Sequence, residues 1–274
     1  MTIVVVLAVV TAAATAVRST WSPCGLSMLS TVTPLAEAGR GRRWPVTAGW
    51  FIAGSVLGGV TLGGAMAALA AVVAVVDPST PVVLAMAAIA ALVCAASDLD
   101  LFGWHIPFHG RQVNERWLDQ YRAWVYGGGF GWQIGVGLAT YITTAGLYLT
   151  ILLAALTGSP ALALAIGMGF GLVRGLAILA GRRITSADRL LVVHRRFAAL
   201  RQPVRLTVVG VLLLDGVVAA TAWLGFAGFV VSGVVAAAIV VVARSEHRDA
   251  VDGLDARSPS SRPGEATVVT STPS

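Results

Sequence analysis

The amino-acid sequence predicts an all-α polytopic membrane protein. Of its 274 residues, 57% are hydrophobic and 12% are charged, about half the charged fraction of a soluble domain, which is roughly 25%. The mean hydropathy is +0.82. Apolar runs that approach or exceed the length of a spanning helix, about 20 residues, recur along the chain. Together these observations favour a bundle of membrane-spanning helices over a soluble domain.

Seven apolar segments are predicted to cross the membrane, with six crossings as the alternative. The first, second and fourth segments are longer than one straight crossing requires, so tilting or a break must absorb the excess. Gly225 and Gly228 predict a tight turn between the last two helices. The predicted segments are residues 2–35, 47–76, 81–97, 125–157, 160–181, 204–222 and 226–243.

The arginines predict how the chain is oriented in the cell (plasma or inner) membrane. The first loop holds Arg40, Arg42 and Arg43, and the fifth loop, residues 181–205, holds seven arginines against one aspartate. The positive-inside rule places both loops in the cytoplasm, so the N-terminus is outside and, with seven spans, the C-terminus is cytoplasmic. Residues 1–244 then form the transmembrane domain. The Ser-, Thr-, Pro- and charge-rich tail, residues 245–274, is predicted to be disordered.

The stretch WSPCGLSMLSTVTP, residues 21–34, predicts a broken first helix. Pro23 removes a backbone donor and clashes with the preceding turn, and hydroxyl groups such as that of Ser27 can satisfy the carbonyl groups that a break releases. Cys24 then lies near the middle of the membrane beside unwound backbone. Two interpretations stay open for Cys24: a redox or substrate-contacting thiol, or a small apolar residue packed at the kink.

The fourth segment looks like a second, inverted copy of the first. A shift of 111 residues sets Trp21–Cys24 against Trp132–Gly135, and three spans separate the two segments, so they cross in opposite directions. This is the pattern of an inverted three-helix repeat with broken first and fourth helices, whose breaks form a central site. Its candidate substrate-binding residues are Pro23, Cys24 and Ser27 on the first element, together with Gln133, Gly135 and Thr144 on the fourth. The glycines around them indicate either a cavity lined by unwound backbone or close helix packing.

Three charges fall inside or beside apolar segments, where a charge is costly and usually faces a partner, a cavity or water. Arg174 and Asp215 lie in the fifth and sixth segments, and we predict that they form a pair, either as a structural ion pair or as part of a substrate site. Arg18 is the third charge and a candidate neighbour of Cys24. It lies six residues before Cys24, a spacing that does not make the two direct helical neighbours.

The first motif resembles the Pro-Cys helix of the CcdA/DsbD transmembrane family of cytochrome c biogenesis, within the LysE-like superfamily. The resemblance implies a similar fold over roughly the first 200 residues, and two cysteines that pass reducing equivalents across the membrane to a thiol protein. Where the family has its second Pro-Cys pair, this chain has Ile134-Gly135. Cys94 lies in the third segment, away from the family's partner position, and a thiol relay needs an attacking and a resolving thiol.

Three functions therefore stay open: a transporter or exporter of a small solute, a single-cysteine thiol protein with a thiol-exchange partner, and a non-transporting scaffold. The lipid bilayer is the expected surrounding, and no basic nucleic-acid-binding arm is present. No GxxxxGK[ST] phosphate loop occurs, and we expect no cofactor and favour a role other than catalysis. His105 and His109 do not predict a metal site, because Pro107 prevents a continuous helix that would align them.

Overall fold

The computed structural model describes residues 1–101, 122–140 and 142–257, and these residues form helices without any strand. This confirms the all-α class. In chain order the elements are α1 (Thr2–Arg18), the 3-10 helix η1 (Ser19–Trp21), α2 (Pro23–Thr31), α3 (Pro34–Gly39), α4 (Trp44–Val76), α5 (Thr80–Asp98), α7 (Ala123–Val136), α8 (Gly146–Leu156), α9 (Pro160–Leu176), η3 (Ala177–Gly181), α10 (Ala187–Leu224) and α11 (Phe226–Arg257).

Six stretches of helix in the described part of the chain are long and apolar enough to cross a membrane, so the protein is polytopic. They correspond to the predicted segments except the fourth. That segment divides into α7 and the short apolar α8. Because neither piece spans a bilayer alone, the difference between six and seven crossings comes down to this broken element.

The first element breaks where the sequence predicts, and local residues account for the break. Pro23 occupies the first position of α2, and the Ser22 hydroxyl caps that helix by accepting a hydrogen bond from the Gly25 N–H at 3.1 Å. A serine cap followed by proline is a strong helix-start signal. A Cβ on Gly25 would stand 2.2 Å from the carbonyl oxygen of Thr20, so only glycine fits this sharp join.

The fourth element breaks at Gly137, whose φ of +74° ends α7 in the region that favours glycine. The chain resumes as a helix only at Gly146, the first residue of α8. The connection between them is therefore much longer than the single-residue join at Ser22.

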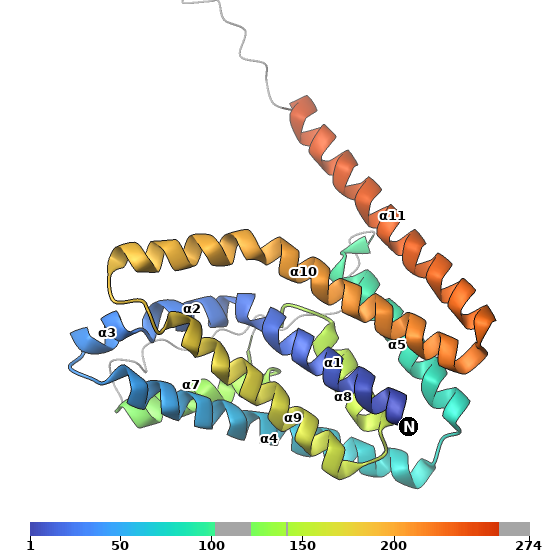
Figure 1. The fold of residues 1–274 in the computed structure, drawn as a ribbon, viewed down its shortest axis with the longest axis horizontal. Helices are drawn as coiled ribbons and strands as arrows, with labels where there is room; N and C mark the ends of the chain where they lie inside the picture. Colours follow the sequence, from blue (N-terminus) through green and yellow to red (C-terminus); the bar gives the residue numbers. More distant parts are fainter. Residues whose placement is uncertain (102–121, 141, 258–274) are drawn as a thin grey trace, which may run out of the picture.

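Each segment of the first half packs against its counterpart in the second half. Helix α1 contacts α8, α4 runs along α9, and α5 runs along α10. In addition, α1 contacts α10, and α8 makes the corresponding contact with α5. Figure 1 shows α1 and α8 together between the α4–α9 pair and the α5–α10 pair. The first and fourth elements thus meet, as the inverted-repeat interpretation requires.

Glycines allow α4 to approach α7 and α9 at backbone distance. A Cβ on Gly131 would stand 2.1 Å from the Phe51 carbonyl oxygen, and one on Gly135 would stand 2.0 Å from that of Ser55. Towards α9, a Cβ on Gly167 would lie 2.4 Å from the Cα of Gly63. Of the two interpretations of the glycine-rich fourth segment, close packing is the one that holds at these positions.

The last two helices extend beyond their predicted limits. Helix α10 begins at Ala187, so much of the arginine-rich stretch predicted as a loop is helical, and the Trp21 indole N–H donates to the Phe197 carbonyl at 2.8 Å. Helix α11 continues to Arg257, past the predicted end at 243 and into the tail for which we predicted disorder. Residues 258–274 lie outside the described part of the chain.

Candidate functional site

The break in the first element places Cys24 inside the protein. Its side chain is 2% exposed and belongs to a hydrophobic cluster with Met28 of α2, Phe51 of α4 and Tyr126 of α7. Pro23, one residue earlier, is exposed, and Ser27 is half-buried. Of the three candidates on this motif, only Cys24 points into the core between the first and fourth elements.

Arg174 of α9 lies between the two breaks. Its side chain is 3% exposed, and its guanidinium lies over the Phe170 ring at 5.6 Å from the centroid. A Cβ built on Gly137, where the fourth element breaks, would stand 3.3 Å from Arg174 Nη1. The guanidinium is also within electrostatic range of Cys24 at the first break. One buried cation is therefore shared by both breaks.

The predicted pairing of Arg174 with Asp215 is wrong. The Asp215 carboxylate accepts a hydrogen bond from the Thr11 hydroxyl of α1 at 2.5 Å. No hydrogen bond or ion pair joins the Arg174 guanidinium to another residue in the described ranges. Asp215 instead fixes α10 against α1, because a buried carboxylate requires a donor. Among the residues that the structure describes, Arg174 is therefore a buried cation without a carboxylate.

The fourth break is held by a residue that the prediction assigned to a loop. The Asp98 carboxylate, at the end of α5, accepts a short hydrogen bond from the Thr144 hydroxyl and another from the Ala145 N–H at 2.6 Å. It thereby caps the start of α8, where free N–H groups and the helix dipole favour an anion. Thr144 was predicted to face a solute, but its hydroxyl is committed to Asp98.

The other two candidates on the fourth element lie on α7. Gly135 is buried against the backbone of α4 at Ser55, so it serves packing. Gln133 is half-buried, and its neighbour Trp132 donates its indole N–H to the Thr61 hydroxyl at 3.1 Å. Neither residue is brought to the Arg174 guanidinium by any contact in the described structure, so Arg174 and Cys24 define the candidate site.

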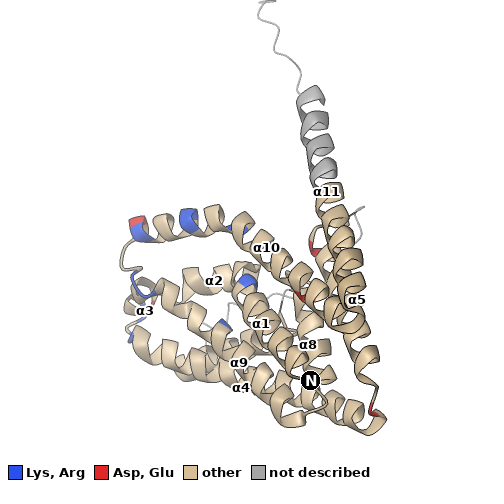
Figure 2. Ribbon diagram, turned by 45° about the vertical axis from the view of Figure 1, so that its right-hand side comes forward, with Lys and Arg blue, Asp and Glu red and all other residues tan. Residues whose placement is uncertain are grey.

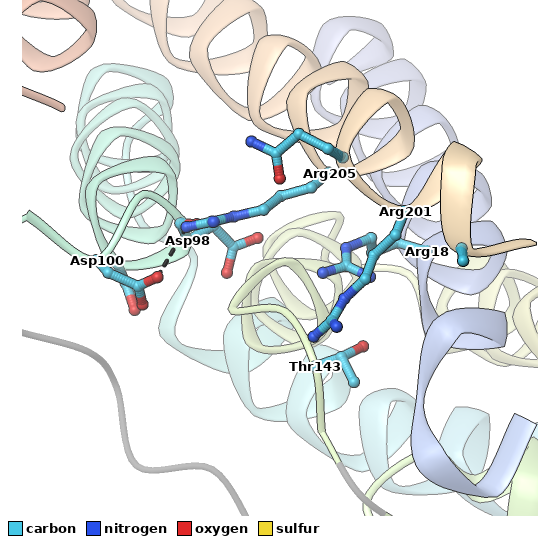
Figure 3. A pocket seen from close by; sticks show the side chains of 9 residues that line it. Arg18, Asp98, Asp100, Thr143, Arg201 and Arg205 are labelled. Carbon is cyan, nitrogen blue, oxygen red and sulfur yellow. Dashed lines mark hydrogen bonds and ion pairs between the residues drawn. The ribbon is translucent and has the colours of Figure 1, made fainter. Parts of the chain in front are cut away.

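A polar cavity of about 410 Å³ lies close to the fourth break. It is lined by Arg18 at the end of α1, Asp98 and Asp100 at the end of α5, Thr143 in the connection before α8, and Arg201 and Arg205 of α10 (Figure 3). Arg205 closes one wall by donating to the Asp98 carbonyl at 2.7 Å and to the Asp100 carboxylate at 2.7 Å. Of these residues, the sequence singled out only Arg18 as a candidate.

Position within the sequence explains why the others were missed. Asp98 falls just after an apolar run, and Arg201 and Arg205 fall just before one, which is also the pattern of loop residues that flank membrane spans. The buried Glu37, which accepts hydrogen bonds from Thr47 at 2.6 Å and Tyr126 at 2.5 Å, was missed for the same reason. Only spatial neighbours distinguish these residues from solvated ones.

The two cysteines do not meet. Cys24 lies in the cluster of α2, α4 and α7, whereas Cys94 is buried in a separate cluster that contains residues of α1 and α8, and neither forms a disulfide. His105 and His109 lie outside the described residues. The arrangement at Cys24 therefore offers a single thiol, with the Arg174 guanidinium within electrostatic range.

Comparisons with known proteins find one group of similar chains. The sequence is 32% identical to the methylamine utilization protein MauF of Paracoccus versutus over 161 residues, which is 58% of this chain and 59% of that protein. It is 33% identical to MauF of Paracoccus denitrificans over 166 residues, or 58% of each chain. The value for MauF of Methylophilus methylotrophus is 30% over 165 residues, with 58% of this chain and 56% of that protein covered.

The matched region spans less than two thirds of each of these relatives. No family model matches the chain, and no solved structure matches it. The chain is thus similar, over somewhat more than half its length, to MauF proteins of methylamine utilization.

Proposed function

We propose that the protein is a transporter or exporter of a small solute, with its solute site where the broken first and fourth elements meet. The observation that carries the proposal is Arg174, a cation buried to 3% exposure between the two breaks without a carboxylate partner in the described structure. Intramembrane charges usually mark substrate or ion pathways. Unwound backbone at both breaks supplies further polar groups for a solute.

The sign of the charge indicates the class of solute. A guanidinium carries five N–H donors in a fork that fits carboxylates and other oxyanions. An unpaired buried cation is costly, and an anion that enters the site offsets that cost. We therefore propose that the solute is a small anion.

The similarity to MauF suggests a role in methylamine utilization for this chain as well. Methylamine is protonated at neutral pH, and its ammonium group would be repelled by the Arg174 guanidinium. Within that role we propose transport of an anion rather than of methylamine itself.

We further propose that the protein lies in the cell membrane with its arginine-rich end in the cytoplasm and its N-terminus outside. Figure 2 shows arginines around α3 and in the first half of α10, whereas the opposite end, at the connection from α4 to α5, shows an acidic residue. This distribution supports the orientation that the positive-inside rule gives.

Flux measurements with purified full-length protein in proteoliposomes test the transport proposal. We expect saturable uptake of at least one of radiolabelled phosphate, sulfate and acetate, but not of methylammonium. Arg174→Ala should reduce this uptake by at least about tenfold, the cost of losing one charge-assisted interaction. Arg195→Gln, which removes an exposed arginine of α10, is the matched control and should transport normally. Equal flux in wild type and Arg174→Ala, or no flux of any of these anions, contradicts the proposal.

The thiol role implied by the resemblance to CcdA/DsbD remains the second candidate. Its specific support is the position of Cys24 at the first break, buried in the cluster of α2, α4 and α7 and within electrostatic range of the Arg174 guanidinium. The separation of the two cysteines into different clusters favours exchange with another protein over exchange within the chain. In that case trapping in membranes should yield a mixed disulfide that Cys24→Ser abolishes and Cys94→Ser retains.

The scaffold role is the third possibility and differs from both in its outcome. A scaffold tolerates Arg174→Ala and Cys24→Ser without any change in flux or trapping, provided that the variants fold. Recovery of monodisperse protein in detergent is therefore the control that accompanies both experiments.

A further inference from the structure

The polar cavity at the ends of α1 and α5 has more cationic than anionic side chains. Three arginines, Arg18, Arg201 and Arg205, face two aspartates, Asp98 and Asp100. Figure 3 shows the Arg18 and Arg201 side chains close together on the Thr143 side of the cavity, with Arg205 turned towards the aspartates. The cavity therefore has two parts with different bonding.

On the aspartate side, the polar groups are already committed. Arg205 donates to the Asp98 carbonyl through Nε at 3.0 Å and Nη2 at 2.7 Å, and to the Asp100 carboxylate at 2.7 Å. The Asp98 carboxylate holds Thr144 and Ala145. These hydrogen bonds satisfy a backbone carbonyl at the end of α5 and a backbone N–H at the start of α8. The polar groups on this side therefore stabilise the fold.

On the arginine side, the donors have no such partners among residues 1–101, 122–140 and 142–257. Neither Arg18 nor Arg201 makes a hydrogen bond or ion pair with another residue of the described ranges. Arg18 is only 8% exposed, and its electrostatic neighbours include Asp98 but also the like charges of Arg205 and Arg201. The Thr143 hydroxyl oxygen is buried and has no hydrogen-bond partner within the described part of the chain. A buried guanidinium and a buried hydroxyl left in this state are costly unless a ligand satisfies them.

We propose that Arg18, Arg201 and Thr143 form a binding site for a small oxyanion of the phosphate, sulfate or carboxylate class. Two guanidinium forks and a hydroxyl supply converging donors, which is the chemistry that oxyanions require. Arg18 comes from the interior and Arg201 from the exposed surface of α10, so the site is reachable from outside the bundle. Its volume of about 410 Å³ admits a free ion or the phosphate of a lipid headgroup.

This site is separate from the one that carries the transport proposal, and it does not depend on transport. Arg174 is enclosed near Gly137, at the end of α7, whereas Thr143 lies in the same connection just before α8. An anion bound at Thr143 would therefore contact the segment that forms the fourth break. Because the transport proposal places an anion at Arg174 as well, binding is measured here on an Arg174→Ala background, so that each site is tested independently of the other.

Direct binding to the full-length protein in detergent tests the inference. Radiolabelled phosphate and sulfate are the probes for a free ion, in a buffer without other multivalent anions. We expect saturable binding to the Arg174→Ala protein, weakened at least about tenfold when Arg201→Gln is added, and unchanged when Arg195→Gln is added. Arg201 is exposed, so its replacement is expected to leave the fold intact. Thr143→Val provides a second variant that removes the hydroxyl while keeping the shape.

A parallel measurement identifies a lipid source. Protein in nanodiscs of phosphatidylglycerol or of phosphatidylcholine is transferred to detergent, and retained lipid is measured by native mass spectrometry. Retention of phosphatidylglycerol that Arg201→Gln abolishes, with no saturable binding of free ions, supports the same site with a headgroup as its ligand. The inference is overturned if phosphate, sulfate and phosphatidylglycerol all fail to bind, or if adding Arg201→Gln to the Arg174→Ala background leaves their binding unchanged.

Discussion

The first and fourth elements are both broken, but they are stabilised in different ways. The first break is closed locally: Ser22 caps α2, Pro23 starts it, and Gly25 allows the close join. The fourth break runs from Gly137 to the start of α8 and is held by Asp98 from α5. Such a break depends on a distant helix, so events in the cavity beside Asp98 can act on the fourth element more readily than on the first.

The largest effect is expected for Asp98→Ala. This change leaves the Thr144 hydroxyl and the Ala145 N–H without an acceptor, and we expect the free energy of unfolding to fall by about 3 kcal/mol. Thermal unfolding in detergent, followed by circular dichroism, measures it. Asp98→Asn retains a carbonyl acceptor and should lose less. If Asp98→Ala is as stable as wild type, the fourth break does not depend on α5.

The next effect concerns the packing of α7 before the fourth break. Gly131→Ala places a methyl group 2.1 Å from the Phe51 carbonyl oxygen, which forces α4 and α7 apart and should cost about 2 kcal/mol. Gly64→Ala in α4 is the matched control, because nothing lies within 4 Å of its Cβ position. The control should be neutral or slightly stabilising, since alanine favours helix. Equal unfolding temperatures for the two variants would contradict close packing of α7 against α4 at Gly131.

A smaller effect is expected at the first break. Ser22→Ala removes the cap on α2 and should cost about 1 kcal/mol. Because the loss is local, we expect it to increase the rate at which a membrane-permeant maleimide labels Cys24, measured on a Cys94→Ser background. A Ser22→Thr variant, which keeps the cap, should label as slowly as its parent. Unchanged labelling in Ser22→Ala would mean that packing against α4 and α7, not the cap, closes this break.

The smallest effect is expected for Asp100→Asn. Its carboxylate pairs with Arg205 at 2.7 Å but is 60% exposed, and exposed ion pairs contribute little, about 0.5 kcal/mol or less. Unfolding in detergent at low and high salt should therefore resemble that of wild type. A loss comparable to that of Asp98→Ala would show that the whole end of α5 acts as one unit.

Much of the fold follows from patterns that are local in the sequence. Apolar runs mark the spans, and the motif around Pro23 marks the first break. The matching motif near Trp132 indicated that the fourth segment is interrupted, and the structure interrupts it at Gly137. The limits of α10 and α11 were missed because an arginine-rich or Ser- and Asp-containing helix lacks the apolar pattern on which the prediction relied.

The candidate site was predicted less well, because its groups come from helices far apart in the chain. Arg174 was correctly singled out as an intramembrane charge, but its pairing with Asp215 was wrong. The depth of a residue along a membrane helix does not determine which face of α9 or α10 its side chain occupies. Thr144 was predicted to bind a solute, yet its hydroxyl donates a hydrogen bond to the Asp98 carboxylate. Asp98 had been placed outside the apolar span.

The class, most of the spans and the first break follow from local sequence patterns, because hydrophobic burial and helix caps act over short stretches of chain. Which charges are satisfied depends on how the helices pack against one another. Asp98, Asp215 and Arg205 each bond to a residue more than forty positions away, whereas Arg18 and Arg174 do not acquire a carboxylate within the described residues. The cost of a buried charge depends on its neighbours in space, and these are fixed only when the helices pack.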